Sequence, residues 1–193
     1  MSNVSNVKVY GLYESFRASK FPMAVDTDDV NDCYTARVKK LAKAAPGSGH
    51  DNFLKGIVVQ FDLKFTPKMS VELERYHFID FVSSQSTMHR ITQFDLDKAY
   101  IEYVDPRVIE VMREKINWYN LLDKSTEEAK RLYLEILYTN PCGMLLTARL
   151  TTNYQQLKTI YSQRKTHRLP EWREFCAWIE TLPLARDLII REE

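Results

Sequence analysis

The chain has 193 residues, of which 45% are hydrophobic, 27% charged and 12% aromatic, and this composition excludes intrinsic disorder over most of its length. A chain of this size can bury one sizeable core without disulfide or metal staples, so we expect a single domain over residues 1–193. Its 27 Lys and Arg residues against 26 Asp and Glu leave a net charge of +1. No global field therefore draws the protein to nucleic acid or to an anionic membrane.

Targeting signals and common cofactor motifs are missing from the sequence. The amino terminus lacks the basic and apolar regions of a secretory signal, and no stretch approaches the ~20 apolar residues of a membrane span, so we expect a cytoplasmic protein without membrane contact. The cysteines (Cys33, Cys142 and Cys176) and the four histidines lack metal-ligand spacing, which argues against a metal site. The five glycines form neither a Rossmann fingerprint nor a P-loop.

The first third of the chain carries one strand signal and one helix signal. Residues 7–13 are rich in β-branched and aromatic side chains, which predicts a strand. Asp28 or Asp29 is a candidate cap for a helix that continues to the Pro and Gly residues at 46–49. That break is the only flexible-looking linker in the sequence.

The middle of the chain shows two strong periodic patterns. Apolar residues alternate with polar ones from Ile57 to Phe65, which predicts a half-buried strand ending at Thr66-Pro67. From Val71 to His89, side chains at steps of three and four share one helical face. We therefore predict a helix whose first turns enter a core and whose last turns, with Gln85, face a cavity.

Caps and helix breakers divide the remainder of the chain. Pro106 and the capping box at 125–128 open two helices, and residues 145–150 suit a short strand. Thr152 can cap a further helix, and Pro170 opens the last one. Because strands come early and helices late, the pattern favours an α+β fold over an alternating α/β sheet.

Two polar clusters could carry chemistry. Gln85, His89 and Arg90 gather at one predicted helix end, where they could recognise a planar heterocycle or a phosphate, or simply form a solvated terminal turn. Asn153 and Arg164 are about three helical turns apart and lie on nearly the same face.

A basic tract from Arg164 to Arg173 contains Leu169 and Trp172 as its only large apolar residues. Basic residues interleaved with an aromatic one suit a nucleic-acid groove. A solvated charged face is the commoner outcome for such a run.

Taken in order, His50, the run at 85–90, the run at 153–157 and Arg164 resemble the flavin-dependent thymidylate synthase (ThyX) family. The resemblance covers roughly residues 50–172. It implies an α+β, ThyX-like fold in which an antiparallel or mixed sheet carries long helices packed on it.

The resemblance also implies roles for individual residues. Gln85, Arg90 and Arg164 would bind a pyrimidine deoxynucleotide. Arg164 would in addition be catalytic, because it would stabilise negative charge that develops on the uracil carbonyls. The residues implied for flavin binding are His50, His89, Arg90 and Asn153.

The chemistry implied by the resemblance is a one-carbon transfer to a dUMP-type nucleotide. Reduced FAD would deliver the hydride and methylenetetrahydrofolate the carbon, with NADPH as the reductant, so the protein itself would mainly orient and polarise the pyrimidine. The family builds its site across chains, which implies a homotetramer. The resemblance is to divergent, phage-type members of the family, so it implies a role in nucleotide metabolism of the sort that phages encode.

The sequence also departs from the family pattern. Met88 stands in place of the first arginine of an Arg-His-Arg motif, and Lys98 and Tyr100 in place of a later serine and arginine. Leu137 occupies a further arginine position, and Lys55-Gly56 that of a Glu-His pair. Part of the phosphate grip is therefore missing, whereas the fold and a flavin or nucleotide pocket survive these changes better.

Two alternatives to a synthase follow. One is a nucleotide-binding or regulatory protein of the same fold whose catalysis is altered. The other is a nucleic-acid or protein interaction module that uses the basic carboxyl-terminal helix, although the balanced net charge speaks against nucleic acid.

Overall fold

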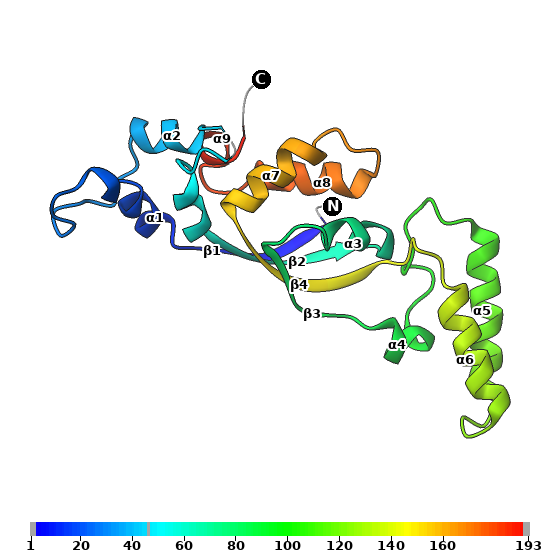
Figure 1. Ribbon diagram of the computed structural model, residues 1–193. Coiled ribbons are helices and arrows are strands. Elements are labelled where there is room, and N and C mark those ends of the chain that lie inside the picture. Colours follow the sequence, from blue (N-terminus) through cyan, green and yellow to red (C-terminus); the bar gives the residue numbers. More distant parts are fainter. Residues whose placement is uncertain (1–2, 46, 191–193) are drawn as a thin grey trace.

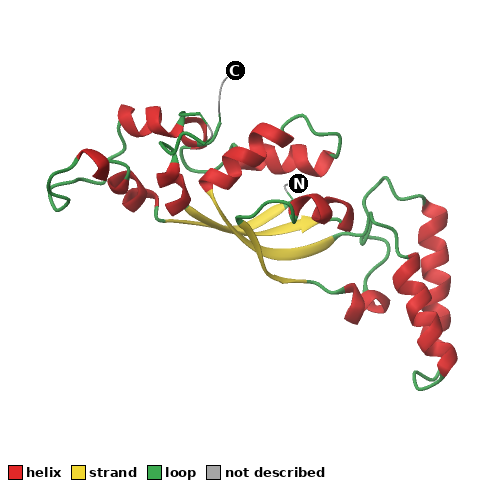
Figure 2. Cartoon of the chain, viewed as in Figure 1, coloured by secondary structure: helices red, strands yellow, loops and turns green. Residues whose placement is uncertain are grey.

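The computed structural model of the chain describes residues 3–45 and 47–190. Their centre is a four-stranded antiparallel sheet in the order β1-β2-β4-β3, drawn as arrows in Figures 1 and 2. The strands are β1 (Val4–Tyr10), β2 (Val58–Phe65), β3 (Ile79–Ser84) and β4 (Leu146–Asn153). The α+β class expected from the sequence is confirmed.

One face of the sheet carries the main core. Phe61 of β2 is fully buried and pairs in register with Leu150 of β4. Its ring lies 4.6 Å from that of Trp178 and 5.7 Å from that of Phe175, both on α8 (Pro170–Ile179). Figure 1 shows α8, α7 (Tyr154–Arg164) and α3 (Pro67–Leu73) over this face. The alternation in β2 is therefore a consequence of burial, which stabilises each such side chain by about 1.5–3 kcal/mol.

The longest described helices pack against each other, away from the sheet (Figures 1 and 2). They are α5 (Pro106–Leu121) and α6 (Glu127–Thr139). Asp105 caps α5 and Thr126 caps α6, each accepting a hydrogen bond from a backbone N–H of the first turn. The cap of α6 thus lies one residue after Ser125, with which the predicted capping box begins. A second apolar cluster holds this hairpin, and its buried members are Ile91, Leu96, Met112, Ile116, Leu132 and Ile136.

Short helices gather at the opposite end of the sheet from the hairpin (Figure 1). They are α1 (Leu12–Ala18), η1 (Phe21–Met23), α2 (Ala36–Ala42), η2 (Asn52–Gly56) and α9 (Ala185–Leu188). Gly11 turns the chain from β1 into α1 with φ of 73°, a conformation that favours glycine.

The single helix predicted from Val71 to His89 is wrong. The chain instead forms α3, β3, α4 (Thr87–Arg90) and η3 (Ile91–Gln93) in succession. Pairing with β4 decides the conformation here, since Ile79 lies opposite Thr152 in the ladder. A local periodicity cannot report such a distant partner.

Three predicted boundaries also need correction. Thr35, and not Asp28 or Asp29, caps α2, because its Oγ1 accepts a hydrogen bond from Val38 N–H at 3.3 Å. The first predicted strand, over residues 7–13, instead spans Val4–Tyr10, because Gly11 turns the chain into α1. Asn153 replaces Thr152 as the cap of α7. Of the predicted break at 46–49, Pro46 lies outside the described residues.

Candidate functional site

A cavity of about 760 Å³ runs along α7, between this helix and the loop that precedes β2. Polar side chains from successive turns of α7 form one wall. Phe78, which precedes β3, and Ile189 add apolar surface. The complete lining is Gly47, Gly49, Asp51, Asn52, Lys55, Phe78, Gln155, Gln156, Lys158, Thr159, Tyr161, Ser162, Gln163, Lys165 and Ile189.

Asn153 caps α7 just before the helix residues that line this cavity. Asn153 Oδ1 accepts a hydrogen bond from Gln156 N–H at 2.9 Å, so α7 begins where β4 ends. Gln156 Oε1 in turn accepts from Phe78 N–H at 3.3 Å. These contacts hold Phe78 at the cavity with 54% of its surface exposed.

A buried ion pair joins the loop to α7. Lys158 Nζ lies 2.6 Å from Asp51 Oδ2, and the two side chains are only 6% and 4% exposed. The ammonium also donates to the carbonyls of Ala42 at 2.6 Å and Ala44 at 3.2 Å, while Gln155 Nε2 donates to Asp51 Oδ1 at 3.1 Å. The pair is therefore hydrogen-bonded on both sides, which is the condition under which buried charges are tolerated.

Two of the flavin-binding residues expected from the sequence adjoin this cavity. His50 is exposed and stands between the lining residues Gly49 and Asp51. Asn153 immediately precedes the turn of α7 that supplies Gln155. Neither His50 nor Asn153 lines the cavity itself, but each lies within two residues of one that does.

Arg164 lies at the far end of α7 in a cage of side chains. Its Nη1 is 2.7 Å from Glu72 Oε2, and its Nε donates to Tyr76 Oη at 2.7 Å. The guanidinium carbon stands 4.9 Å from the ring centre of Trp172, whose Nε1 donates to the same Glu72 oxygen at 3.0 Å. With 16% of its side chain exposed, Arg164 is held in one orientation, which suits a group that recognises a planar ligand.

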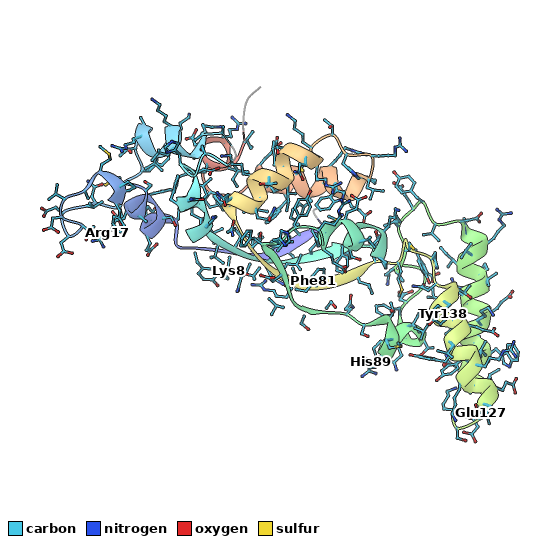
Figure 3. All side chains as sticks on the ribbon, viewed as in Figure 1. Lys8, Arg17, Phe81, His89, Glu127 and Tyr138 are labelled. Atoms are coloured by element: carbon cyan, nitrogen blue, oxygen red, sulfur yellow. The ribbon has the colours of Figure 1, made fainter. Side chains whose placement is uncertain are left out.

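Gln85, His89 and Arg90 lie at the other end of the sheet, next to the helical hairpin. Gln85 extends the pairing of β3 with β4: its backbone N–H donates to Thr147 O at 2.9 Å, and its Oε1 accepts from Thr147 N–H at 2.8 Å. His89 and Arg90 are exposed on α4, and Figure 3 shows His89 beside the hairpin. Within one chain, these three residues do not meet the cavity along α7.

The positions that depart from the family pattern have structural partners. Tyr100 donates to Asn140 Oδ1 at 2.9 Å, and burial raises the pKa of its phenol to about 12. Leu137 packs against the apolar cluster of the hairpin. Lys98 pairs with Asp95 at 3.0 Å on the surface.

Sequence reasoning missed the groups that hold the expected site residues in place. Glu72 and Trp172 around Arg164, and the pair Asp51–Lys158, had no local signal that named them as partners. In the structure Lys158 is buried on α7, directly after the buried Leu157. A charge at such a position requires a buried partner.

The described residues contain no cluster of His, Cys, Asp and Glu side chains that could hold a metal ion. Among the same residues, no helix has both the length and the apolar character needed to cross a membrane.

Comparisons with known proteins identify the fold. No family model and no curated protein matches the sequence. Among solved structures, the flavin-dependent thymidylate synthase ThyX from Helicobacter pylori, complexed with FAD and dUMP, superposes with a TM-score of 0.71 at 13% identity, over 97% of this chain and 100% of that one. A second structure of ThyX from Helicobacter pylori with FAD and dUMP gives 0.70 at 14% identity, over 96% and 97%.

A UMP/dUMP methylase, PolB from Streptomyces cacaoi bound with 5-Br dUMP, has a TM-score of 0.64 at 16% identity, over 97% of this chain and 94% of that one. The chain therefore has the ThyX fold, as the sequence resemblance implied. At these identities the likeness establishes the fold alone.

Proposed function

We propose that the chain binds FAD in the cavity along α7 and a pyrimidine deoxynucleotide beside it, and that it transfers a one-carbon unit to a dUMP-type base. The observation that carries the proposal is a cavity of about 760 Å³ whose lining includes close sequence neighbours of His50 and Asn153, in a chain with the ThyX fold over nearly its whole length. Residues 1–193 then form a single ThyX-like domain.

The lining of the cavity fits a flavin dinucleotide. Lys55 supplies a cation for a diphosphate, and the side-chain amides of Asn52 and Gln163 supply donors and acceptors for a heterocycle. Phe78 offers an aromatic ring with 54% of its surface exposed, on which a planar ring system can stack.

The chain's own residues bind and polarise the nucleotide. When bound, the flavin supplies hydride from NADPH, and methylenetetrahydrofolate supplies the carbon. Glu72 and Tyr76 hold Arg164 by Nη1 and Nε, so its Nη2 edge can donate to a uracil carbonyl. Negative charge that develops on that oxygen would be stabilised by about 3–4 kcal/mol.

A complete site then requires more than one copy of the chain. Figure 3 shows His89 beside the hairpin, Arg90 follows it on α4, and none of Gln85, His89 and Arg90 lines the cavity along α7. A second copy can bring its own Gln85 and Arg90 to the nucleotide, and its His89 and Arg90 to the flavin. The family resemblance implies that the assembly is a homotetramer, and we propose that state. We also propose that the protein works in cytoplasmic nucleotide metabolism of the kind that phages encode.

The test is conversion of dUMP to dTMP with FAD, NADPH and methylenetetrahydrofolate. Arg164→Lys should retain FAD and lower turnover at least about a hundredfold, since lysine lacks the planar fork. Lys64→Ala, an exposed position on β2, is the matched control and should leave turnover unchanged. If the wild-type protein turns over dUMP and the Arg164→Lys variant is equally active, the role proposed for Arg164 is wrong.

A nucleotide-binding protein of the same fold without turnover is the second candidate. Two positions favour it, because the resemblance implies arginines there. Tyr100 instead donates a hydrogen bond to Asn140, and Leu137 packs in the apolar cluster of the hairpin. It predicts dUMP binding by calorimetry together with no dTMP when every substrate is supplied.

A further inference from the structure

A second cavity of about 610 Å³ lies on another part of the molecule. It is open to solvent and bordered by the start of α5, the start of α8, the first turn of α3 and the loop that precedes β4, and it shares no lining residue with the cavity along α7. The residues around it are Lys68, Ile101, Tyr103, Val104, Asp105, Val108, Pro141, Cys142, Gly143, Arg168, Leu169, Pro170, Glu171 and Arg173.

The wall of this cavity is largely apolar. Ile101, Val104 and Val108 face it from one side, and Leu169 from the other. Gly143 allows the loop to approach this wall closely, because a Cβ at this position would lie 2.3 Å from Val104 Cγ2. The wall can therefore accept an apolar group rather than a fully hydrated ion.

Three cations stand around this apolar wall. Arg173 Nη1 donates to the carbonyls of His167 at 2.7 Å and Arg168 at 2.8 Å, which fixes its guanidinium at the rim. Lys68 and Arg168 form no ion pair with any of the residues that the structure describes. Arg168 and Arg173 of the basic tract are thus exposed and also line this cavity.

The two acids of the lining do not cancel this charge. Asp105 is held by Arg107, whose Nε lies 3.1 Å from its Oδ2. Glu171 is 6% exposed, and its Oε1 accepts hydrogen bonds from Thr66 N–H at 3.0 Å and Thr66 Oγ1 at 2.8 Å. Asp105 is therefore paired with Arg107, whereas Glu171 keeps its charge but is buried, and the three exposed cations of the lining outnumber it.

The amino terminus of α8 also lies at this cavity, where Glu171 in its first turn offsets part of the helix dipole. The helix is ten residues long, and no side chain caps its amino terminus, where Leu169, Pro170 and Glu171 line the cavity. Backbone N–H groups at such an end carry partial positive charge and lack intrahelical acceptors. Cations, an uncapped helix end and an apolar wall are thus combined in one cavity.

We propose that this cavity is a second binding site, for an organic anion with an apolar body and a carboxylate or phosphate head. The apolar body lies against Val104 and Val108, and the head meets Lys68, Arg168 and Arg173. The volume falls within the range usual for small-molecule sites. The inference does not depend on the flavin chemistry, because the two cavities share no residue.

Cys142 provides a reporter inside the site, and Cys33 provides its control. Both are exposed, whereas Cys176 is buried. The wild-type protein is alkylated with neutral iodoacetamide, and labelling at each cysteine is followed by peptide mass spectrometry. Octyl phosphate and octanoate are the probes, with octanol as the uncharged control, and comparing the first two tells a phosphate from a carboxylate head.

We expect at least one of the two anions to slow labelling of Cys142 in a saturable way and to leave labelling of Cys33 unchanged. Octanol should protect Cys142 much more weakly. Arg168→Ala, an exposed position, should raise the concentration for half-protection about fivefold. Lys55→Ala, on the other cavity, should leave it unchanged. Equal protection by octanol, or protection unaffected by Arg168→Ala, would overturn the proposal. An oligothymidylate is tested as a nucleic-acid probe, and protection of Cys142 by it alone would also overturn the proposal.

Discussion

Replacing Asp51 with Asn tests the ion pair that fastens the loop carrying His50 to α7. Asn keeps the shape and the hydrogen bond from Gln155, but it removes the charge that faces Lys158 Nζ at 2.6 Å. At an effective dielectric constant of about 20, the lost attraction is about 6 kcal/mol. Two carbonyl contacts remain to the ammonium, so we expect the free energy of unfolding to fall by about 3–5 kcal/mol.

Urea unfolding at neutral pH measures this loss as a lower midpoint at constant slope. Asp62→Asn is the control, since Asp62 pairs with Arg149 where both side chains remain 23–28% exposed, and it should cost at most about 1 kcal/mol. The double variant Asp51→Asn, Lys158→Met should recover most of the loss, because it removes the stranded charge. If Asp51→Asn costs no more than Asp62→Asn, the pair does not fasten the loop.

Three further predictions concern single positions. Gly11→Ala should destabilise the protein by more than about 1 kcal/mol in urea unfolding, because its φ is 73° and a Cβ would lie 2.4 Å from Gly56 O; a neutral effect would contradict the turn geometry. Iodoacetamide at pH 8 should label Cys33 and Cys142 but spare Cys176, whose thiol pKa burial raises to about 12; fast labelling there would refute its burial. The hydrogen bond with Lys39 lowers the pKa of the Asp187 carboxyl in the folded protein, so its contribution to stability is present above pH ~4 and is lost as pH falls through the folded pKa. Asp187→Asn should flatten the acid limb of a pH–stability profile, and an unchanged limb would contradict that contribution.

Local signals were sufficient for part of the fold. The alternation over β2 and the caps of α5 and α6 predicted those elements because burial and capping act within a few residues of sequence. Strand β3 was missed because its conformation depends on pairing with β4, which lies far along the chain. The spacing from Val71 to His89 matched a helix, yet the sheet overrode it.

For the candidate site, too, the sequence predicted some residues but not the contacts that hold them in place. The resemblance named Arg164 and Asn153, and the structure gives each of them a fixed place. Their supporting contacts could not be predicted, because Glu72 lies 92 residues from Arg164 in sequence. Asp51 is likewise 107 residues from Lys158. Contacts at that range follow from packing of α3 and the loop on α7, which no local pattern encodes.

Whether the cavity along α7 holds a flavin is tested most directly by the visible absorption spectrum of the protein after FAD is added and the excess is removed by gel filtration. We predict a retained flavin band in the wild-type protein. The band should weaken strongly in the double variant Phe78→Ala, Lys55→Ala, which changes two exposed residues of the cavity lining, and it should persist in Lys64→Ala. A folded wild-type protein that retains no flavin, or a double variant that retains it fully, would contradict the account.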